Sequence, residues 1–96
     1  MSRPYFSPSS RQDLHDVLEY IARDKPGAAG EFVAKLENEC WLLAKNPGLG
    51  SLRDDLMPEL RCWSVGNYVI YFFTTADGID IARVLHCARD VGRLIP

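Results

Sequence analysis

The chain has 96 residues, of which 47% are hydrophobic and 25% are charged, and it carries a formal net charge of −2 with a sequence pI near 5.6. This length and composition predict one small folded domain and exclude a disordered chain. The net charge of an acidic protein does not attract the negatively charged backbone of a nucleic acid, so nucleic acid is disfavoured as the primary ligand.

No segment reaches the roughly 20 apolar residues that a membrane helix requires, and residues 1–4 are not followed by the apolar core of a signal peptide. The three cysteines, Cys40, Cys62 and Cys87, are odd in number and lack a CxxC spacing, which argues against a disulfide framework or a zinc site. The sequence also lacks a Ser-His-Asp order, a phosphate-binding glycine loop and a His-carboxylate spacing for a metal. We therefore expect a cytoplasmic protein with reduced thiols, no metal and no cofactor.

The first elements are a short strand over residues 5–7 and an amphipathic helix. A capping box, formed by Ser9 with Gln12 or by Ser10 with Asp13, predicts where this helix begins. The helix should run for about 13 to 15 residues, with His15 on its solvated face. Its apolar stripe consists of Leu14, Val17, Leu18 and Ile21.

A second helix follows almost at once. Asp24 is a good N-cap and Pro26 fits the first helical turn, where its missing N–H is no loss. The apolar stripe then continues to Lys45, which predicts a helix of about 19 residues, roughly 28 Å long. So short a connection makes an antiparallel helix hairpin whose two apolar stripes face one target.

Residues 46–58 form an irregular loop, and three strands follow at 60–65, 68–74 and 79–86. The turns between them lie at Gly66-Asn67 and at residues 75–78, so the strands form an antiparallel meander. The predicted fold class is α+β with the order β-α-α-β-β-β. In this fold the helix hairpin packs on one face of a small, mainly antiparallel sheet.

The middle strand of the meander is apolar on both faces. Tyr68, Ile70 and Phe72 point one way, while Val69, Tyr71 and Phe73 point the other. Two helices can cover one face only, so the other face should present some 300 Å² of apolar surface, worth about 7 kcal/mol when buried. We expect a tight protein partner or a second copy of the chain to cover that face.

Two tryptophans are candidate contacts for such a partner. Trp63, on the strand beside Tyr71, is either an interface anchor or a core residue under the helices. Trp41 widens the apolar stripe of the second helix near its end, which indicates contact beyond the domain.

A few polar residues could carry chemistry. His86 lies near Arg83 and Arg89. It could act as a general acid or base while the arginines stabilise the charge of a phosphate. The alternative is that His86 only packs the end of its strand. Arg61 and Arg83 flank the apolar strand. They either frame a cationic patch on the open sheet face or pair with Asp80 and Glu59.

An ordered set of short motifs between residues 4 and 90 resembles the ParE toxins of the RelE/ParE superfamily. Each motif alone is weak, but the ordered set is specific. The motifs are Ser7-Pro8, Asp13-Leu14, Tyr20-Ile21-Ala22, Asp24-Lys25-Pro26, Ala28-Ala29, Pro47, Gly50, Arg53, residues 58–61, Val65-Gly66-Asn67-Tyr68, Asp77-Gly78-Ile79 and Arg83-Val84-Leu85-His86-Cys87-Ala88-Arg89-Asp90.

The resemblance implies that residues 1–96 are a single toxin domain of a bacterial type II toxin–antitoxin system. Such a toxin inhibits DNA gyrase rather than acting as an enzyme, and a ParD-like antitoxin neutralises it in a hetero-oligomer. The implied antitoxin contacts are Trp41, Trp63, Tyr68, Tyr71 and Phe73. The implied target contacts are Arg61, Arg83, His86, Arg89 and Arg93.

The alternative from the same superfamily is a RelE-like, ribosome-dependent mRNA endoribonuclease. It would use Arg61, Arg83 and His86 as catalytic residues. Phe73 stands where many relatives carry a basic residue, which favours the gyrase inhibitor. Glu59 and Cys87 replace glycines that are usual in the family, and residues 89–96 are a candidate effector segment.

Overall fold

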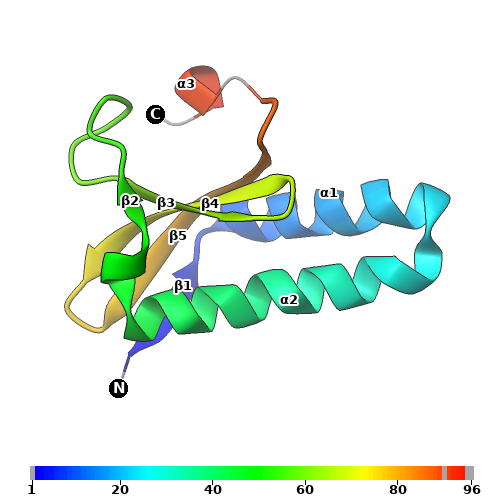
Figure 1. Cartoon of the computed structure of the whole chain (residues 1–96), viewed down its shortest axis with the longest axis horizontal. Helices are drawn as coiled ribbons and strands as arrows, with labels where there is room; N and C mark the ends of the chain where they lie inside the picture. The colour runs from blue at the N-terminus through cyan, green and yellow to red at the C-terminus, as the bar shows by residue number, and fades with distance from the viewer. Residues whose placement is uncertain (1, 90, 95–96) are drawn as a thin grey trace.

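The computed structural model describes residues 2–89 and 91–94. An antiparallel pair of long helices forms one layer and a twisted sheet forms the other, as Figure 1 shows. The helices are α1 (Pro8–Asp24), α2 (Pro26–Lys45), the 3-10 turn η1 (Pro47–Leu49) and α3 (Val91–Leu94). The strands are β1 (Arg3–Phe6), β2 (Ser51–Leu52), β3 (Arg61–Val65), β4 (Tyr68–Thr75) and β5 (Gly78–His86).

Helix α1 begins earlier than the sequence predicts. Its N-cap is Ser7, whose side-chain oxygen accepts a hydrogen bond from the backbone N–H of Ser10 at 3.0 Å. The predicted capping boxes at Ser9 and Ser10 are therefore wrong. A residue before proline is driven into the extended region, and proline itself suits the first helical position, so Pro8 places the cap at Ser7. The helix then runs for 17 residues.

The junction between the helices also lies one residue later than expected. Asp24 is the last residue of α1 rather than the N-cap of α2, and Lys25 is the single connecting residue. Lys25 leaves the helical region because Pro26 follows it, and its N–H still closes the last turn on the Ile21 carbonyl oxygen at 2.8 Å. Helix α2 has 20 residues, so the predicted hairpin is confirmed.

The sheet has five strands in the order β1-β5-β4-β3-β2. Strand β1 runs parallel to β5, and the other pairs are antiparallel, which confirms the predicted α+β class with a mainly antiparallel sheet. The predicted loop contains two short elements, η1 and the two-residue β2. A bulge interrupts the β4–β5 pairing, where Tyr71 lies opposite Arg83 but Phe72 lies opposite Ile81.

The main core lies between the sheet and the helix hairpin. Leu36 and Leu43 of α2 pack with Ile70 and Phe72 of β4, and all four side chains are fully buried. This is the arrangement that the two helical stripes predict. One face of the doubly apolar strand is therefore covered by the helices, as expected.

The second sheet face is covered mainly by the chain itself. Leu56, Met57 and Leu60 of the loop before β3, together with Val91 of α3, pack on a cluster that contains Tyr71 and Leu85. Tyr71 is only 6% exposed. The expectation that a partner covers this whole face is wrong, because the loop carries apolar side chains of its own.

That loop is closed by its own hydrogen bonds. The Arg53 N–H donates to the Leu60 carbonyl oxygen at 2.7 Å, and the Glu59 N–H donates to Oδ1 of Asp54 at 2.8 Å. Glu59 has a φ of 66°, a left-handed conformation that favours glycine. Among the described residues, neither long helix is apolar enough to cross a membrane.

Candidate functional site

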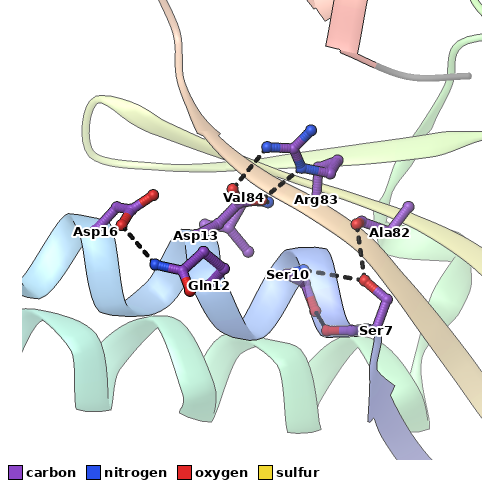
Figure 2. Close-up of polar contacts among 8 residues, drawn as sticks. All are labelled: Ser7, Ser10, Gln12, Asp13, Asp16, Ala82, Arg83 and Val84. Atoms are coloured by element: carbon purple, nitrogen blue, oxygen red, sulfur yellow. Dashed lines mark hydrogen bonds and ion pairs between the residues drawn. The ribbon is translucent and has the colours of Figure 1, made fainter.

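The edge of β5 beyond β1 is bonded to the start of α1. Strand β1 ends at Phe6, opposite Ile81, so no described strand lies beside the following residues of β5 on that side. The Ser7 N–H donates to the Ile81 carbonyl oxygen at 3.2 Å, and the Ser7 hydroxyl donates to the Ala82 carbonyl oxygen at 3.0 Å. The Val84 N–H donates to Oδ2 of Asp13 at 2.9 Å. Helix α1 thus takes over the role of a neighbouring strand, as Figure 2 shows.

Arg83 is bound to the same carboxylate. Its Nε donates to Oδ2 of Asp13 and its Nη2 donates to Oδ1, both at 2.7 Å (Figure 2). The side chains of Asp13 and Arg83 are only 7% and 20% exposed. The hydrogen bond that Arg83 donates to the Asp13 carboxylate raises the pKa of Arg83 further above its ordinary value. The predicted pairing with Asp80 or Glu59 is wrong for Arg83, because its partner lies on α1.

Arg61 and Arg83 do not frame a common cationic patch. Arg61 lies opposite Phe72 and Arg83 opposite Tyr71, and these neighbouring residues of β4 point to opposite faces of the sheet. Arg61 donates from Nη1 to the Gly50 carbonyl oxygen at 2.8 Å. It forms no salt bridge within the part of the chain that the structure describes. The predicted patch is therefore wrong, because Arg61 binds the backbone of Gly50 and Arg83 binds Asp13 of α1.

His86 packs at the end of β5. Its ring meets Tyr68 edge-on, with centroids 5.3 Å apart and planes at 84°. Its Nδ1 accepts a hydrogen bond from the Ala88 N–H at 3.1 Å. These contacts match the prediction that His86 packs the strand end. His86 and Arg89 line one groove, whereas the side chain of Arg93 lies outside the described residues.

The five aromatic candidates are divided between the two sheet faces. Trp63 and Tyr68 lie on the helix side, where Trp63 donates from Nε1 to Oε1 of Glu39 at 3.5 Å. Tyr71 and Phe73 lie on the other side, in the cluster under the loop. Trp41 is on α2 and remains 44% exposed. They do not form one continuous surface, and Tyr68 and Tyr71 are buried by the chain itself.

Exposed apolar side chains gather instead where α2 ends. Sequence reasoning found Trp41 and Leu42 there but missed Leu49 and Leu52, because both lie in the stretch predicted to be irregular. Figure 1 shows η1 and β2 beside the C-terminal end of α2. We call Trp41, Leu42, Leu49 and Leu52 the α2–β2 apolar surface; each is between 40% and 53% exposed.

The outer edge of β3 lies in the same part of the molecule. Strand β2 pairs only with Arg61 and Cys62, so no described strand covers the edge of β3 at residues 63–65. An unpaired strand edge can accept an extended segment of another protein, which adds to the sheet through backbone hydrogen bonds. The α2–β2 apolar surface and this edge together have the features of a protein-binding site.

Comparison with known proteins identifies relatives of the chain. A family model described as the ParE toxin of the type II toxin–antitoxin system parDE matches residues 5–91. Toxin ParE1 of Mycobacterium tuberculosis is 30% identical over 95 residues, covering 96% of each chain. Toxin ParE1 of Caulobacter vibrioides is 28% identical over 87 residues, covering 88% of each chain.

Two solved structures share the fold. A chain from the chromosomal ParDE system of P. aeruginosa superposes with a TM-score of 0.77 at 17% identity, covering 90% of this chain and 96% of that one. A chain from the RelBE2 complex of Mycobacterium tuberculosis gives 0.59 at 22% identity, covering 88% and 96%. These likenesses concern the fold. The family-model match over nearly the whole chain confirms the resemblance: the chain belongs to the ParE toxin family of type II toxin–antitoxin systems.

Proposed function

We propose that this ParE-type toxin inhibits DNA gyrase without being an enzyme, and that a ParD-like antitoxin binds and neutralises it in the cytoplasm. The observation that carries the proposal is the family-model match, whose description names the parDE system. A related fold also occurs in a structure titled as a ParDE system. Inhibition of gyrase is the activity that the resemblance to ParE toxins implies.

The surface features support a role in binding proteins. The antitoxin would lay an extended segment along residues 63–65 of β3 and place apolar side chains on the α2–β2 apolar surface. Trp41 and Trp63 flank this path and keep accessible surface, and tryptophan is a frequent hot spot in protein interfaces. Tyr68 and Tyr71 are buried, so we leave them out of the antitoxin site.

The arginine contacts favour a binding protein over the endoribonuclease. A nuclease of this superfamily would need Arg61, Arg83 and His86 to converge on one phosphate. Arg83 is committed to Asp13, and Arg61 is committed to the backbone of Gly50. His86 packs against Tyr68 at the end of β5. These three side chains thus serve the fold, and their contacts support the non-enzymatic proposal.

Controlled expression in bacteria tests the proposal. We expect growth arrest with induction of the DNA-damage response, and we expect co-expression of a cognate ParD-like antitoxin to restore growth. Transcripts should stay intact during the arrest. Arrest with cleaved transcripts and no DNA-damage response would support the RelE-like alternative, and a His86→Ala variant would then lose the cleavage.

A further inference from the structure

A groove outside the proposed antitoxin site lies between α1 and the end of β5, and we call it the α1–β5 groove. Its volume is about 460 Å³, within the usual range of roughly 300–1,000 Å³ for ligand sites. The buried residues among its lining are Asp13, Val17, Tyr68, Val84 and Leu85. Arg23 and Tyr20 of α1 line it on one side, and His86 and Arg89 line it on the other.

Tyr68 brings an unpartnered hydroxyl to the groove. Its side chain is only 9% exposed, and its ring is held between Phe32, at a centroid distance of 5.6 Å, and His86. The hydroxyl has no hydrogen bond to any described residue, yet it is not among the fully buried polar atoms. Burial raises the pKa of Tyr68 above its ordinary value, so the group stays a neutral donor.

Three further donors line the same groove. Because Nδ1 of His86 accepts the Ala88 N–H, the neutral ring carries its proton on Nε2. Arg23 and Arg89 are exposed, and neither forms an ion pair with a described residue. Three carboxylates also line the groove, and each has a partner: Asp13 binds Arg83, Asp16 accepts from Gln12 at 2.9 Å, and Glu19 pairs with His15. The groove therefore offers donors that lack an acceptor.

We propose that the α1–β5 groove binds an acidic peptide segment of a partner protein, with an apolar side chain on Val17 and Val84 and a carboxylate facing Tyr68, His86, Arg23 and Arg89. Charge-assisted hydrogen bonds to a carboxylate are about twice as strong as neutral ones. A nucleic-acid strand is a poorer fit, because it has no aliphatic side chain to place on Val17 and Val84 and carries a negative charge at every nucleotide. This site goes beyond the proposed function and does not depend on it.

Capped peptides test the chemistry on the whole chain. The probes are acetyl-Gly-Glu-Leu-Glu-Gly-amide and its counterparts with glutamine or lysine in place of both glutamates. Backbone NMR titration should show saturable shifts at Tyr68, His86 and Ala88 with the glutamate peptide. We expect the glutamine peptide to bind at least about fivefold more weakly and the lysine peptide to cause no saturable shift. Equal affinity for all three peptides, tighter binding of the lysine peptide, or no binding at millimolar concentration would overturn the proposal.

Two matched pairs of variants locate the site. Tyr68→Phe removes only the hydroxyl, so it should fold normally and weaken the glutamate peptide about threefold or more. Tyr5→Phe, at an exposed tyrosine outside the groove, should change nothing. Arg89→Ala should weaken binding while Lys35→Ala, on α2, does not. Unchanged binding in both groove variants, or preferential binding of a five-nucleotide thymidine strand, would contradict the acidic-peptide site.

Discussion

Asp13 of α1 binds Arg83 of β5 through both of its carboxylate oxygens, although the two residues lie 70 positions apart. The same carboxylate accepts the Val84 N–H, at the place where β1 has ended and β5 has no strand on that side. The ion pair therefore joins α1 of the helix layer to the edge of β5 in the sheet layer.

Removal of this carboxylate should destabilise the protein. Asp13→Ala leaves Arg83 without its carboxylate partner and the Val84 N–H without its acceptor, so the free energy of unfolding should fall by about 2–3 kcal/mol. Asp13→Asn keeps one acceptor and should cost less. Asp16→Ala, three residues away on the exposed face, should change stability by less than about 0.5 kcal/mol. Urea unfolding measures all three, and equal effects of Asp13→Ala and Asp16→Ala would contradict the structural role.

Gly78 should tolerate no side chain. Its φ is 144°, and a Cβ there would overlap the carbonyl oxygen of Arg3 on β1. Gly78→Ala should therefore detach β1 and lower the free energy of unfolding by about 3 kcal/mol or more. At Gly27, in the first turn of α2, a Cβ meets nothing, so Gly27→Ala should stabilise by about 0.5 kcal/mol. Thermal unfolding of the two variants gives the comparison; similar shifts of Tm would show that the close approach at Gly78 is absent.

The three thiols should differ widely in reactivity. Burial raises the pKa of Cys40 to about 12, so its reactive thiolate is scarce at neutral pH, whereas Cys87 is exposed. A thiol reagent should label Cys87 rapidly and Cys40 only on unfolding. Because the pKa of Cys40 is higher in the folded than in the unfolded chain, its contribution to stability is complete below pH 9 and is lost as the pH rises towards 12. Fast labelling of Cys40 in a Cys87→Ser variant under native conditions would contradict its burial.

Local sequence signals predicted the elements well. The apolar stripes of α1 and α2 and the turn at Gly66-Asn67 depend on neighbours a few residues apart, so the hairpin and the meander could be derived from them. The predicted helix caps were wrong by one residue at α2 and by two or three at α1, because Pro8 and Pro26 restrict the residue before them and that effect was not weighed against the capping boxes.

Contacts between distant segments could not be derived in the same way. No local pattern ties Asp13 to Arg83 or sets β1 parallel to β5. The sequence did not predict what covers the second sheet face, because Leu56, Met57 and Leu60 lie in a loop without periodicity. These side chains contact the sheet only because the loop folds back over it. The candidate site was predicted least well, because the burial of Tyr68 and Tyr71 depends on these long-range contacts.

Trp41 should contribute to the affinity for the antitoxin and not to the stability of the fold. Its side chain is exposed on α2, so Trp41→Ala should change the free energy of unfolding by less than about 0.5 kcal/mol. Binding of the ParD-like antitoxin should weaken by at least about 30-fold, which corresponds to about 2 kcal/mol. Tyr5→Ala is the control, because Tyr5 is also an exposed aromatic residue but lies on β1, at the opposite edge of the sheet from β2. Calorimetric titration measures both variants, and equal losses of affinity would remove Trp41 from the antitoxin site.

Inhibition of DNA gyrase is the central claim, and a purified system tests it most directly. The chain is incubated with gyrase, ATP and plasmid DNA, with or without the ParD-like antitoxin, and the DNA is then resolved on a gel. The account predicts that cleaved DNA accumulates and supercoiling is lost, and that the antitoxin prevents both effects. Unchanged supercoiling with no cleaved DNA, from a preparation of the toxin that still binds the antitoxin, would contradict it.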